Sequence, residues 1–264
     1  MTGESFREAF VDADGFRIRY LEGGSGPVLI CMHGGGGLRL APAHDILARD
    51  YRVIAFEMPG FGKSENSRST STEDLARSMN AAVAALQVER YSLMGTSFGS
   101  KVALWMAIQR PEPVDAIVLI SPAAIRMQEG PVPTHVSPEE GLRLLYAHPE
   151  RQPKLTPPPR ELMAKHAAFT SRLLGPPRDA AFEARLADVS IPVLVLFGTV
   201  DRVTPPEGAH LFREALPNCH IVFVYDAAHA IDADRPEALA SVAGDFLARK
   251  GQFLVRQTSG VIYP

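Results

Sequence analysis

The sequence predicts an α/β protein with a mostly parallel central sheet and helices on both faces. Short, continuously apolar runs alternate along the chain with segments of helical periodicity, the order of strand–helix units in a parallel sheet. The apolar runs lack polar alternation, which indicates that both faces of each strand are covered. With 264 residues, 46% of them hydrophobic, the chain can form a sizeable core.

The expected elements follow one another in a regular order. An opening β-hairpin is expected from residues 11–12 and 16–21, joined around Ala13-Asp14-Gly15. Further strands are expected at 28–32, 52–56, 91–96, 116–121, 192–197 and 221–225, and helices at 72–87, 98–110, 206–216 and 235–249.

The alternation stops between Pro122 and Ser190. This segment is crowded with proline and carries short helical patterns at 138–147, 160–174 and 180–187. A connection of about 65 residues is too long for a simple loop, and long insertions in compact domains are usually lids or binding segments. We therefore expect a helical, proline-rich cap (residues 122–190) inserted into a core domain of residues 1–121 and 191–264. An ordinary surface excursion is the alternative.

One serine stands between two glycines where the strand 91–96 meets the helix 98–110. The motif is Gly95-Thr96-Ser97-Phe98-Gly99. A strand that enters a helix through G-x-S-x-G is typical of a nucleophile elbow, in which the serine occupies a sharp, strained turn. Both glycines are expected because larger side chains would collide with neighbouring backbone. If Ser97 were only a helix N-cap, the glycines would remain unexplained.

Three further motifs follow predicted strands. His33-Gly34-Gly35-Gly36-Gly37 follows the strand 28–32, Asp201 follows the strand 192–197, and His229 follows the strand 221–225. In open α/β sheets, ligands bind at the carboxyl ends of the strands. With these motifs in this order, the chain resembles the α/β-hydrolases with a serine nucleophile, from about Phe10 to about Lys250.

The resemblance implies an α/β-hydrolase fold and a Ser97–Asp201–His229 catalytic triad. His229 would take the proton of Ser97 as the serine attacks a carbonyl carbon, and Asp201 would orient the imidazole. The alternatives are a turn residue at Asp201 and a solvated loop histidine at His229. No Asp or Glu follows the strand 116–121, so the other usual position of the acid is empty. Asp226 and Asp232 lie too close to His229 in sequence to orient it.

The negative oxygen of the tetrahedral intermediate needs hydrogen-bond donors. The resemblance assigns one to the backbone N–H of Phe98 and the other to the glycine loop, at Gly35 or, as the second choice, Gly36. This chemistry requires no metal and no cofactor.

The remaining histidines and glycines have other expected roles. His33 is expected to anchor the glycine loop by a hydrogen bond, whereas His44, His210 and His220 are expected at the surface. His135, His148 and His166 fall in the expected cap. Gly60-Phe61-Gly62-Lys63-Ser64 ends like a phosphate-binding loop, but Glu57 stands where its first glycine is required. The stretch 57–64 instead resembles the D-x-P-G-x-G-x-S turn of α/β-hydrolases, with Glu in place of Asp.

The leading functional prediction is a serine hydrolase that cleaves an ester or related acyl bond of a small or medium substrate. A serine nucleophile argues against haloalkane dehalogenases and epoxide hydrolases, which use Asp here. Hydrolysis of a C–C bond in a vinylogous diketone is the alternative, although such enzymes often carry a tryptophan soon after the catalytic histidine. Here Ala230-Ile231-Asp232 follows. A binding or sensor protein of the same fold is a third alternative.

Composition limits partners and location. The net charge of −3 and the lack of a Lys/Arg run argue against nucleic-acid or membrane partners, leaving a small-molecule substrate. Cys31 and Cys219 are expected to be buried, reduced thiols. Without a signal-peptide pattern or an apolar stretch of about 18 residues, a cytoplasmic location is expected. The tail 251–264 would pack on the body or on a second subunit, as in a homodimer.

Overall fold

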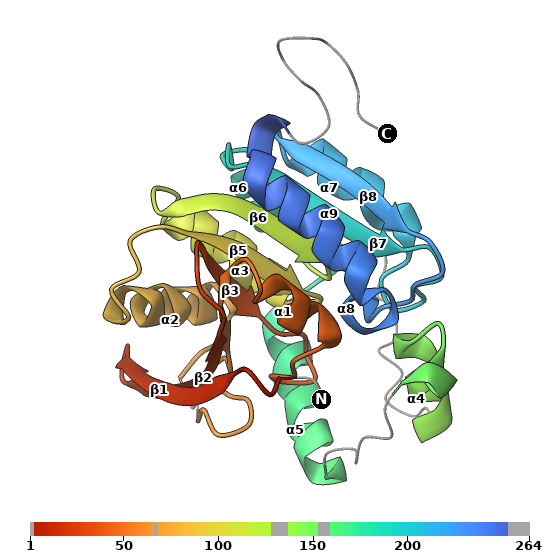
Figure 1. The fold of residues 1–264 in the computed structure, drawn as a ribbon, viewed down its shortest axis with the longest axis horizontal. Helices are drawn as coiled ribbons and strands as arrows, with labels where there is room; N and C mark the ends of the chain where they lie inside the picture. Colours follow the sequence, from red (N-terminus) through yellow and green to blue (C-terminus); the bar gives the residue numbers. More distant parts are fainter. Residues whose placement is uncertain (1–2, 66–67, 128–136, 153–158, 253–264) are drawn as a thin grey trace.

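The computed structural model describes residues 3–65, 68–127, 137–152 and 159–252. Among these residues, one eight-stranded sheet has the order β1-β2-β4-β3-β5-β6-β7-β8 (Figure 1). The strands are β1 (Arg7–Ala13), β2 (Phe16–Gly23), β3 (Val28–Met32), β4 (Arg52–Phe56), β5 (Tyr91–Thr96), β6 (Val114–Ile120), β7 (Val193–Gly198) and β8 (Cys219–Val224). The fold class predicted from the sequence is confirmed.

The sheet is antiparallel at one side and parallel across the rest. β1 pairs with β2 and β2 with β4 in antiparallel fashion. From β4 through β3 and β5 to β8 every pairing is parallel. The carboxyl ends of these six strands therefore meet at one edge of the sheet.

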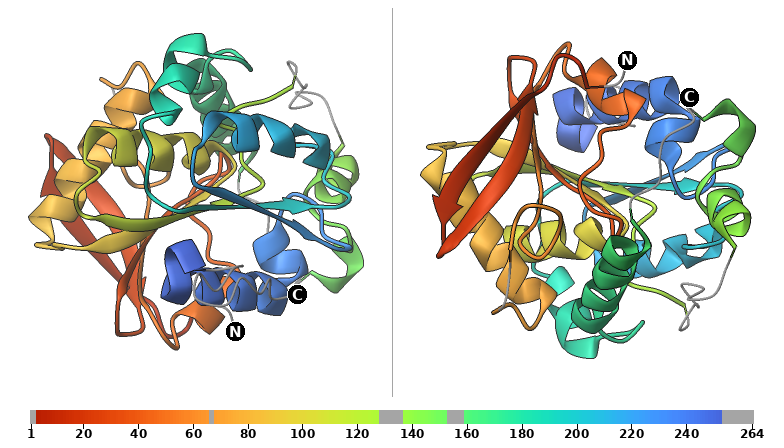
Figure 2. Two further views of the ribbon diagram at one scale, coloured as in Figure 1. Left: turned by 90° about the horizontal axis from the view of Figure 1, so that it is seen from above. Right: turned by 90° about the horizontal axis from the view of Figure 1, so that it is seen from below.

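Helices cover both faces of the sheet (Figure 2). One layer contains α1 (Pro42–Leu47), α8 (Ile231–Asp234) and α9 (Pro236–Arg249), and the other contains α2 (Thr72–Ala85), α3 (Phe98–Gln109) and α7 (Ala209–Ala215). Alternate residues of β3 enter two separate core clusters, Ile30 on one face and Leu29 on the other. This two-sided burial explains why the parallel strands are continuously apolar in sequence.

The segment 122–190, called the insertion below, contains three α-helices within its described residues. They are α4 (Pro138–Leu145), α5 (Arg160–Leu174) and α6 (Ala180–Leu186), with a short 3-10 turn η1 (Pro149–Arg151) after α4. α4 and α5 lie beyond the carboxyl ends of the parallel strands (Figure 1). Side chains at Ser137 and Asp179 accept hydrogen bonds from the first turns of α4 and α6 and so mark where these helices begin.

The structure differs from the sequence prediction at several places. α1 and α8 were not expected, and the region 206–216 begins with a 3-10 turn, η2 (Pro206–Gly208), before α7. His44, expected at the surface, is buried because α1 packs against α9. His220 is half-buried, whereas His210 is exposed as predicted. Both cysteines are buried free thiols, also as predicted.

Two expectations fall on residues outside the described ranges. The tail lies there from residue 253 onward, and so does His135. Within the described part of the chain, no helix combines the length and the apolar character that a membrane span needs.

Candidate active site

Ser97 occupies a strained turn between β5 and α3. Its φ of 50° and ψ of −114° are unusual for a residue with a side chain. A Cβ on Gly95 would lie 2.7 Å from the carbonyl oxygen of Gly99, and a Cβ on Gly99 would lie 2.5 Å from that of His33. As the sequence predicts, the chain can pass through this turn only with glycine at both positions.

Asp201 and His229 are in direct contact beyond the ends of β7 and β8. The His229 Nδ1 atom lies 3.0 Å from Asp201 Oδ2, and the side chains are 9% and 0% exposed, respectively. The two loops approach closely because Gly198 ends β7, where a Cβ would collide with the backbone oxygens of Ala227 and Ala228. This geometry requires the His229 Nδ1–H to donate to the carboxylate.

Three more hydrogen bonds hold the Asp201 carboxylate. Oδ1 accepts from the backbone N–H groups of Val203 and Thr204 at 2.8 and 2.9 Å, and Oδ2 accepts from the Thr204 hydroxyl at 2.8 Å. Burial alone would raise the pKa of Asp201, but the bonds from His229 and Thr204 and the charge of His229 hold this pKa below its ordinary value. Thr204 was not singled out from the sequence, although its position three residues after a strand-end Asp is typical of a side-chain-capped turn.

The glycine loop lies beside Ser97. A Cβ on Gly34 would be 3.4 Å from the Ser97 Cβ. The loop closes as a turn in which the Gly37 N–H donates to the Gly34 carbonyl at 3.2 Å. A second donor to this carbonyl is His33, whose Nδ1 lies 2.6 Å away. The predicted anchoring of the loop by His33 is therefore confirmed.

The tautomer of His33 follows from its other contact. Its Nε2 accepts a hydrogen bond from the Met58 N–H at 3.1 Å, so the ring proton is on Nδ1. Burial lowers the pKa of His33 to about 4, which keeps the ring neutral. In a trans peptide the C=O and N–H groups point in opposite directions. With its oxygen directed at His33, the Gly34–Gly35 peptide therefore directs the Gly35 N–H away from that ring.

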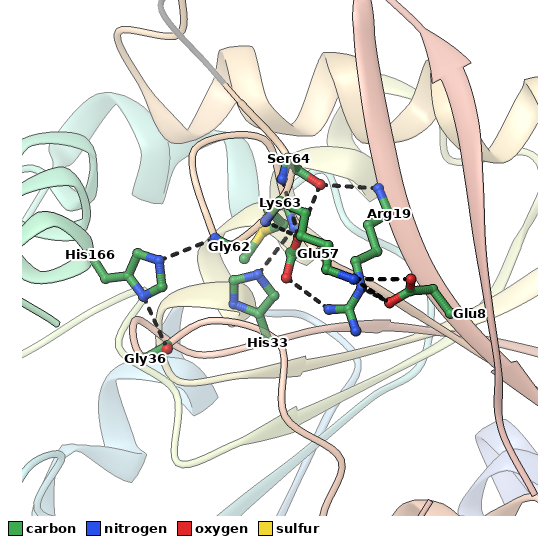
Figure 3. A network of polar contacts seen from close by, with 10 residues as sticks. Glu8, Arg19, His33, Gly36, Glu57, Gly62, Lys63, Ser64 and His166 are labelled. Carbon is green, nitrogen blue, oxygen red and sulfur yellow. Dashed lines mark hydrogen bonds and ion pairs between the residues drawn. The ribbon is translucent and has the colours of Figure 1, made fainter. Parts of the chain in front are cut away.

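The turn 57–64 lies next to the glycine loop and contacts it through His33 and His166 (Figure 3). Glu57 Oε2 accepts from the N–H groups of Lys63 and Ser64 at 2.7 and 3.1 Å. Its other oxygen pairs with Arg19 at 2.9 Å, and the Glu57 side chain is 5% exposed. Glu57 thus organises this turn from the position at which the resembling α/β-hydrolase turn usually carries aspartate.

The insertion contacts both sides of this region. On α5, the Thr170 hydroxyl lies 3.5 Å from the Gly35 carbonyl, and His166 contacts Gly36. Past α4, His148 contacts Asp226 at 2.8 Å. Among the described residues, no cluster of three or more His, Cys, Asp or Glu side chains suits a metal ion.

Comparison with known proteins identifies the family. A model of the α/β hydrolase fold matches residues 27–164, and a model described as TAP-like protein matches residues 172–253. The first covers more than half of the chain, so the protein belongs to the α/β-hydrolase fold family and is a hydrolase by this relationship.

Individual relatives differ in the reactions that they are named for. A 2-hydroxy-6-oxo-6-(2'-aminophenyl)hexa-2,4-dienoic acid hydrolase of Metapseudomonas resinovorans is 28% identical over 93% of this chain and 92% of its own. A membrane phospholipase A structure is 27% identical with a TM-score of 0.78, over 92% of this chain and 86% of its own. A serine hydrolase involved in carbazole degradation is 27% identical with a TM-score of 0.75, over 92% and 99% of the two chains.

Proposed function

We propose that this protein is a serine hydrolase that cleaves an ester or related acyl bond of a small or medium substrate through an acyl-enzyme. The observation that carries the proposal is the strained Ser97 turn at the same sheet edge as the hydrogen-bonded Asp201–His229 pair. A serine hydroxyl is a poor nucleophile without a base, and a histidine oriented by a carboxylate is suited to that role.

The proposed reaction begins with attack of Ser97 Oγ on the substrate carbonyl carbon. Because His229 Nδ1–H donates to Asp201, Nε2 is the ring atom that accepts the serine proton. The protonated ring then gives this proton to the leaving alcohol, and the acyl group stays on Ser97. Water, deprotonated by the same imidazole, releases the acid and restores the serine.

The developing oxyanion would be bound by the backbone N–H groups of Phe98 and Gly35. Phe98 is the first residue of α3, where N–H groups lack partners within the helix. Gly35 is supported as the second donor because the oxygen of the Gly34–Gly35 peptide is directed toward His33, which directs the Gly35 N–H away from that ring. Gly36 is the second choice. Its N–H belongs to the Gly35–Gly36 peptide, whose oxygen lies 3.5 Å from the Thr170 hydroxyl on α5.

Hydrolysis of a C–C bond in a vinylogous diketone is the second candidate. It is favoured by the likeness to the dienoic acid hydrolase of Metapseudomonas resinovorans over most of both chains. The same serine, base and oxyanion donors would serve this reaction. The two candidates therefore differ in the bond that breaks, not in the residues proposed.

Reaction with a fluorophosphonate, followed by intact-mass analysis, tests the serine mechanism. Wild type should gain one adduct and Ser97→Ala none, while both proteins keep the same melting temperature. Adducts on both proteins, or on neither, would contradict the proposal. Comparison of kcat/KM for p-nitrophenyl butyrate and 2-hydroxy-6-oxo-6-phenylhexa-2,4-dienoate then decides between the candidates, since preference for the dienoate would assign C–C cleavage.

A further inference from the structure

His166 on α5 connects the insertion to the glycine loop. Its Nδ1 lies 3.2 Å from the carbonyl oxygen of Gly36, and its Nε2 lies 3.2 Å from the backbone nitrogen of Gly62 (Figure 3). The Gly62 N–H is a donor, so Nε2 accepts and the ring proton is on Nδ1. His166 therefore donates to the Gly36 carbonyl and accepts from the turn 57–64.

This arrangement repeats that of His33. Both imidazoles donate from Nδ1 to a carbonyl of the glycine loop, and both accept at Nε2 from an N–H of the turn 57–64. The Phe61 ring contacts both, with centroid distances of 4.6 Å to His33 and 4.9 Å to His166. Two neutral histidines from distant parts of the chain thus fix two carbonyls of one loop.

A series of hydrogen-bonded peptides runs from His166 toward Ser97. His166 holds the oxygen of the Gly36–Gly37 peptide, and the N–H of that peptide donates to the Gly34 carbonyl at 3.2 Å. The Gly34–Gly35 peptide ends in the Gly35 N–H, the proposed oxyanion donor. Hydrogen bonds in such a series polarise and orient one another.

The surroundings of His166 suit a neutral, fixed ring. The residue is 6% exposed, and a Cβ on Gly37 would lie 3.1 Å from its Cε1. Burial lowers the pKa of His166, the charge of Lys165 acts in the same direction, and Glu57 and the Gly36 carbonyl oppose it. A protonated ring could not accept from Gly62, so this shift favours the observed bond.

We propose that His166 is a positioning residue for the oxyanion hole, acting through the Gly36–Gly37 and Gly34–Gly35 peptides. The proposal rests on the proposed serine hydrolase function. It extends that function by giving the insertion a part in stabilising the transition state, since the bond crosses from α5 to the core domain.

α5 has other attachments that do not involve the glycine loop. Lys101 on α3 donates to the Leu174 carbonyl at 2.9 Å, and Leu173 is 3% exposed within the core. Loss of the His166 hydrogen bonds should therefore leave α5 in place. A Leu173→Ala variant removes one core contact at the end of α5, away from His166 and the glycine loop, and is the matched control for a general loss of stability.

The test compares His166→Phe, His166→Gln and Leu173→Ala with wild type. Loss of a direct oxyanion donor typically lowers turnover about 10²–10³-fold, so an indirect positioning role should lower kcat about 10- to 100-fold. For p-nitrophenyl butyrate, His166→Phe should lower kcat by this factor with little change in KM. It should slow fluorophosphonate labelling, in which Ser97 Oγ displaces fluoride from phosphorus, by a similar factor. His166→Gln keeps one donor and one acceptor and should recover part of both rates.

Leu173→Ala should lower the melting temperature while kcat and labelling rate stay near wild type. Wild-type rates in a folded His166→Phe, or equal loss of kcat in Leu173→Ala, would overturn the positioning role. If wild type itself is not labelled at Ser97, the proposed function fails instead, and the two failures are distinguishable.

A measurement on wild type avoids dependence on any folded variant. In ¹⁵N-histidine-labelled protein, long-range ¹H–¹⁵N correlation distinguishes Nδ1–H from Nε2–H rings. His166, assigned by its absence in His166→Gln, should be neutral and carry its proton on Nδ1 at pH 7. An Nε2–H or doubly protonated ring would break the contact with Gly62 and overturn the proposal.

Discussion

Ser97 is held in place by backbone geometry, whereas Asp201 and His229 are held by side-chain hydrogen bonds. At the first region, a Cβ on either elbow glycine would meet neighbouring backbone atoms. At the second, four hydrogen bonds converge on one carboxylate. The Ser97 turn should therefore respond mainly to changes of shape, and the Asp201–His229 pair mainly to changes of charge and hydrogen bonding.

The insertion also makes different contacts with the two regions of the site. α5 packs on the nucleophile side, where the Phe169 ring lies 5.4 Å from that of Phe61 and His166 contacts the glycine loop. The end of α4 and the chain after it meet the region of His229 through polar groups: the Ala230 N–H donates to the Leu145 carbonyl at 2.8 Å, and the Ala147 N–H donates to Asp234 at the same distance. Four substitutions test this comparison, in order of decreasing free-energy effect.

Asp201→Asn should have the largest effect and should act on catalysis more than on folding. The amide cannot accept from His229 Nδ1–H as a charged carboxylate does, so kcat should fall about 10⁴-fold, or about 5.5 kcal/mol in activation free energy. Steady-state ester hydrolysis measures this. Asp226→Asn, at a half-buried carboxylate paired with His148 and Arg235, is the control and should stay within about twofold of wild type. Equal losses would show that Asp201 has no special part.

Gly99→Ala should act on the nucleophile side through shape alone. Its Cβ would collide with the Met32 oxygen and lie 2.5 Å from that of His33, so unfolding free energy should fall by about 3–4 kcal/mol. Urea denaturation measures this. Gly244→Ala in α9, where a Cβ meets nothing within 4 Å, should instead add about 0.5–1 kcal/mol. A stable Gly99→Ala protein would refute the steric requirement.

The regular elements that position the site could be predicted from local sequence. The strands 28–32, 52–56 and 91–96 and the helix 160–174 have the predicted bounds, because continuous apolar runs and helical periodicity are local signals. α1 was missed because it spans only Pro42–Leu47, too short for a periodic pattern. The burial of His44 was missed for the same reason, because it depends on the packing of α1 against α9.

Only the part of the site that lies in recognisable sequence motifs could be predicted. Asp201 and His229 meet as expected because both follow strands that pair in the sheet. His166 had no local signal, since its partners Gly36 and Gly62 lie far away in sequence and its helix is mostly exposed. Contacts between the insertion and the core depend on tertiary packing, which one sequence does not encode in any short pattern.

His33→Gln should alter how stability depends on pH. The pKa of His33 falls from 6.5 to about 4 on burial, so the unfolded chain binds a proton that the folded protein does not. The contribution of the neutral ring to the free energy of unfolding is fully present above pH 6.5. About 2–3 kcal/mol of it is lost as the pH falls toward 4. Denaturation at pH 7 and pH 4.5 should show a smaller difference for His33→Gln than for wild type. His210→Gln, at an exposed histidine, should keep the wild-type difference.

Asp234→Ala should have the smallest effect of the four and should separate the two attachments of the insertion. Asp234 Oδ2 accepts from the N–H groups of Ala228 and Ala147 at 2.9 and 2.8 Å, so it fixes the residue before His229 and the chain after α4 together. Leaving these N–H groups without their acceptor should cost about 1–2 kcal/mol of unfolding free energy.

Turnover should also fall in Asp234→Ala, by about tenfold, because His229 loses its support from the preceding residue. Fluorophosphonate labelling and ester hydrolysis at a temperature well below the melting point measure this. Asp226→Ala is the matched control, since it also removes a contact between the region of His229 and the insertion, but one made between two half-buried side chains and not to the backbone before His229. If Asp234→Ala loses stability but keeps the wild-type kcat, the chain after α4 does not influence the reacting groups. The insertion would then act on them through α5 alone.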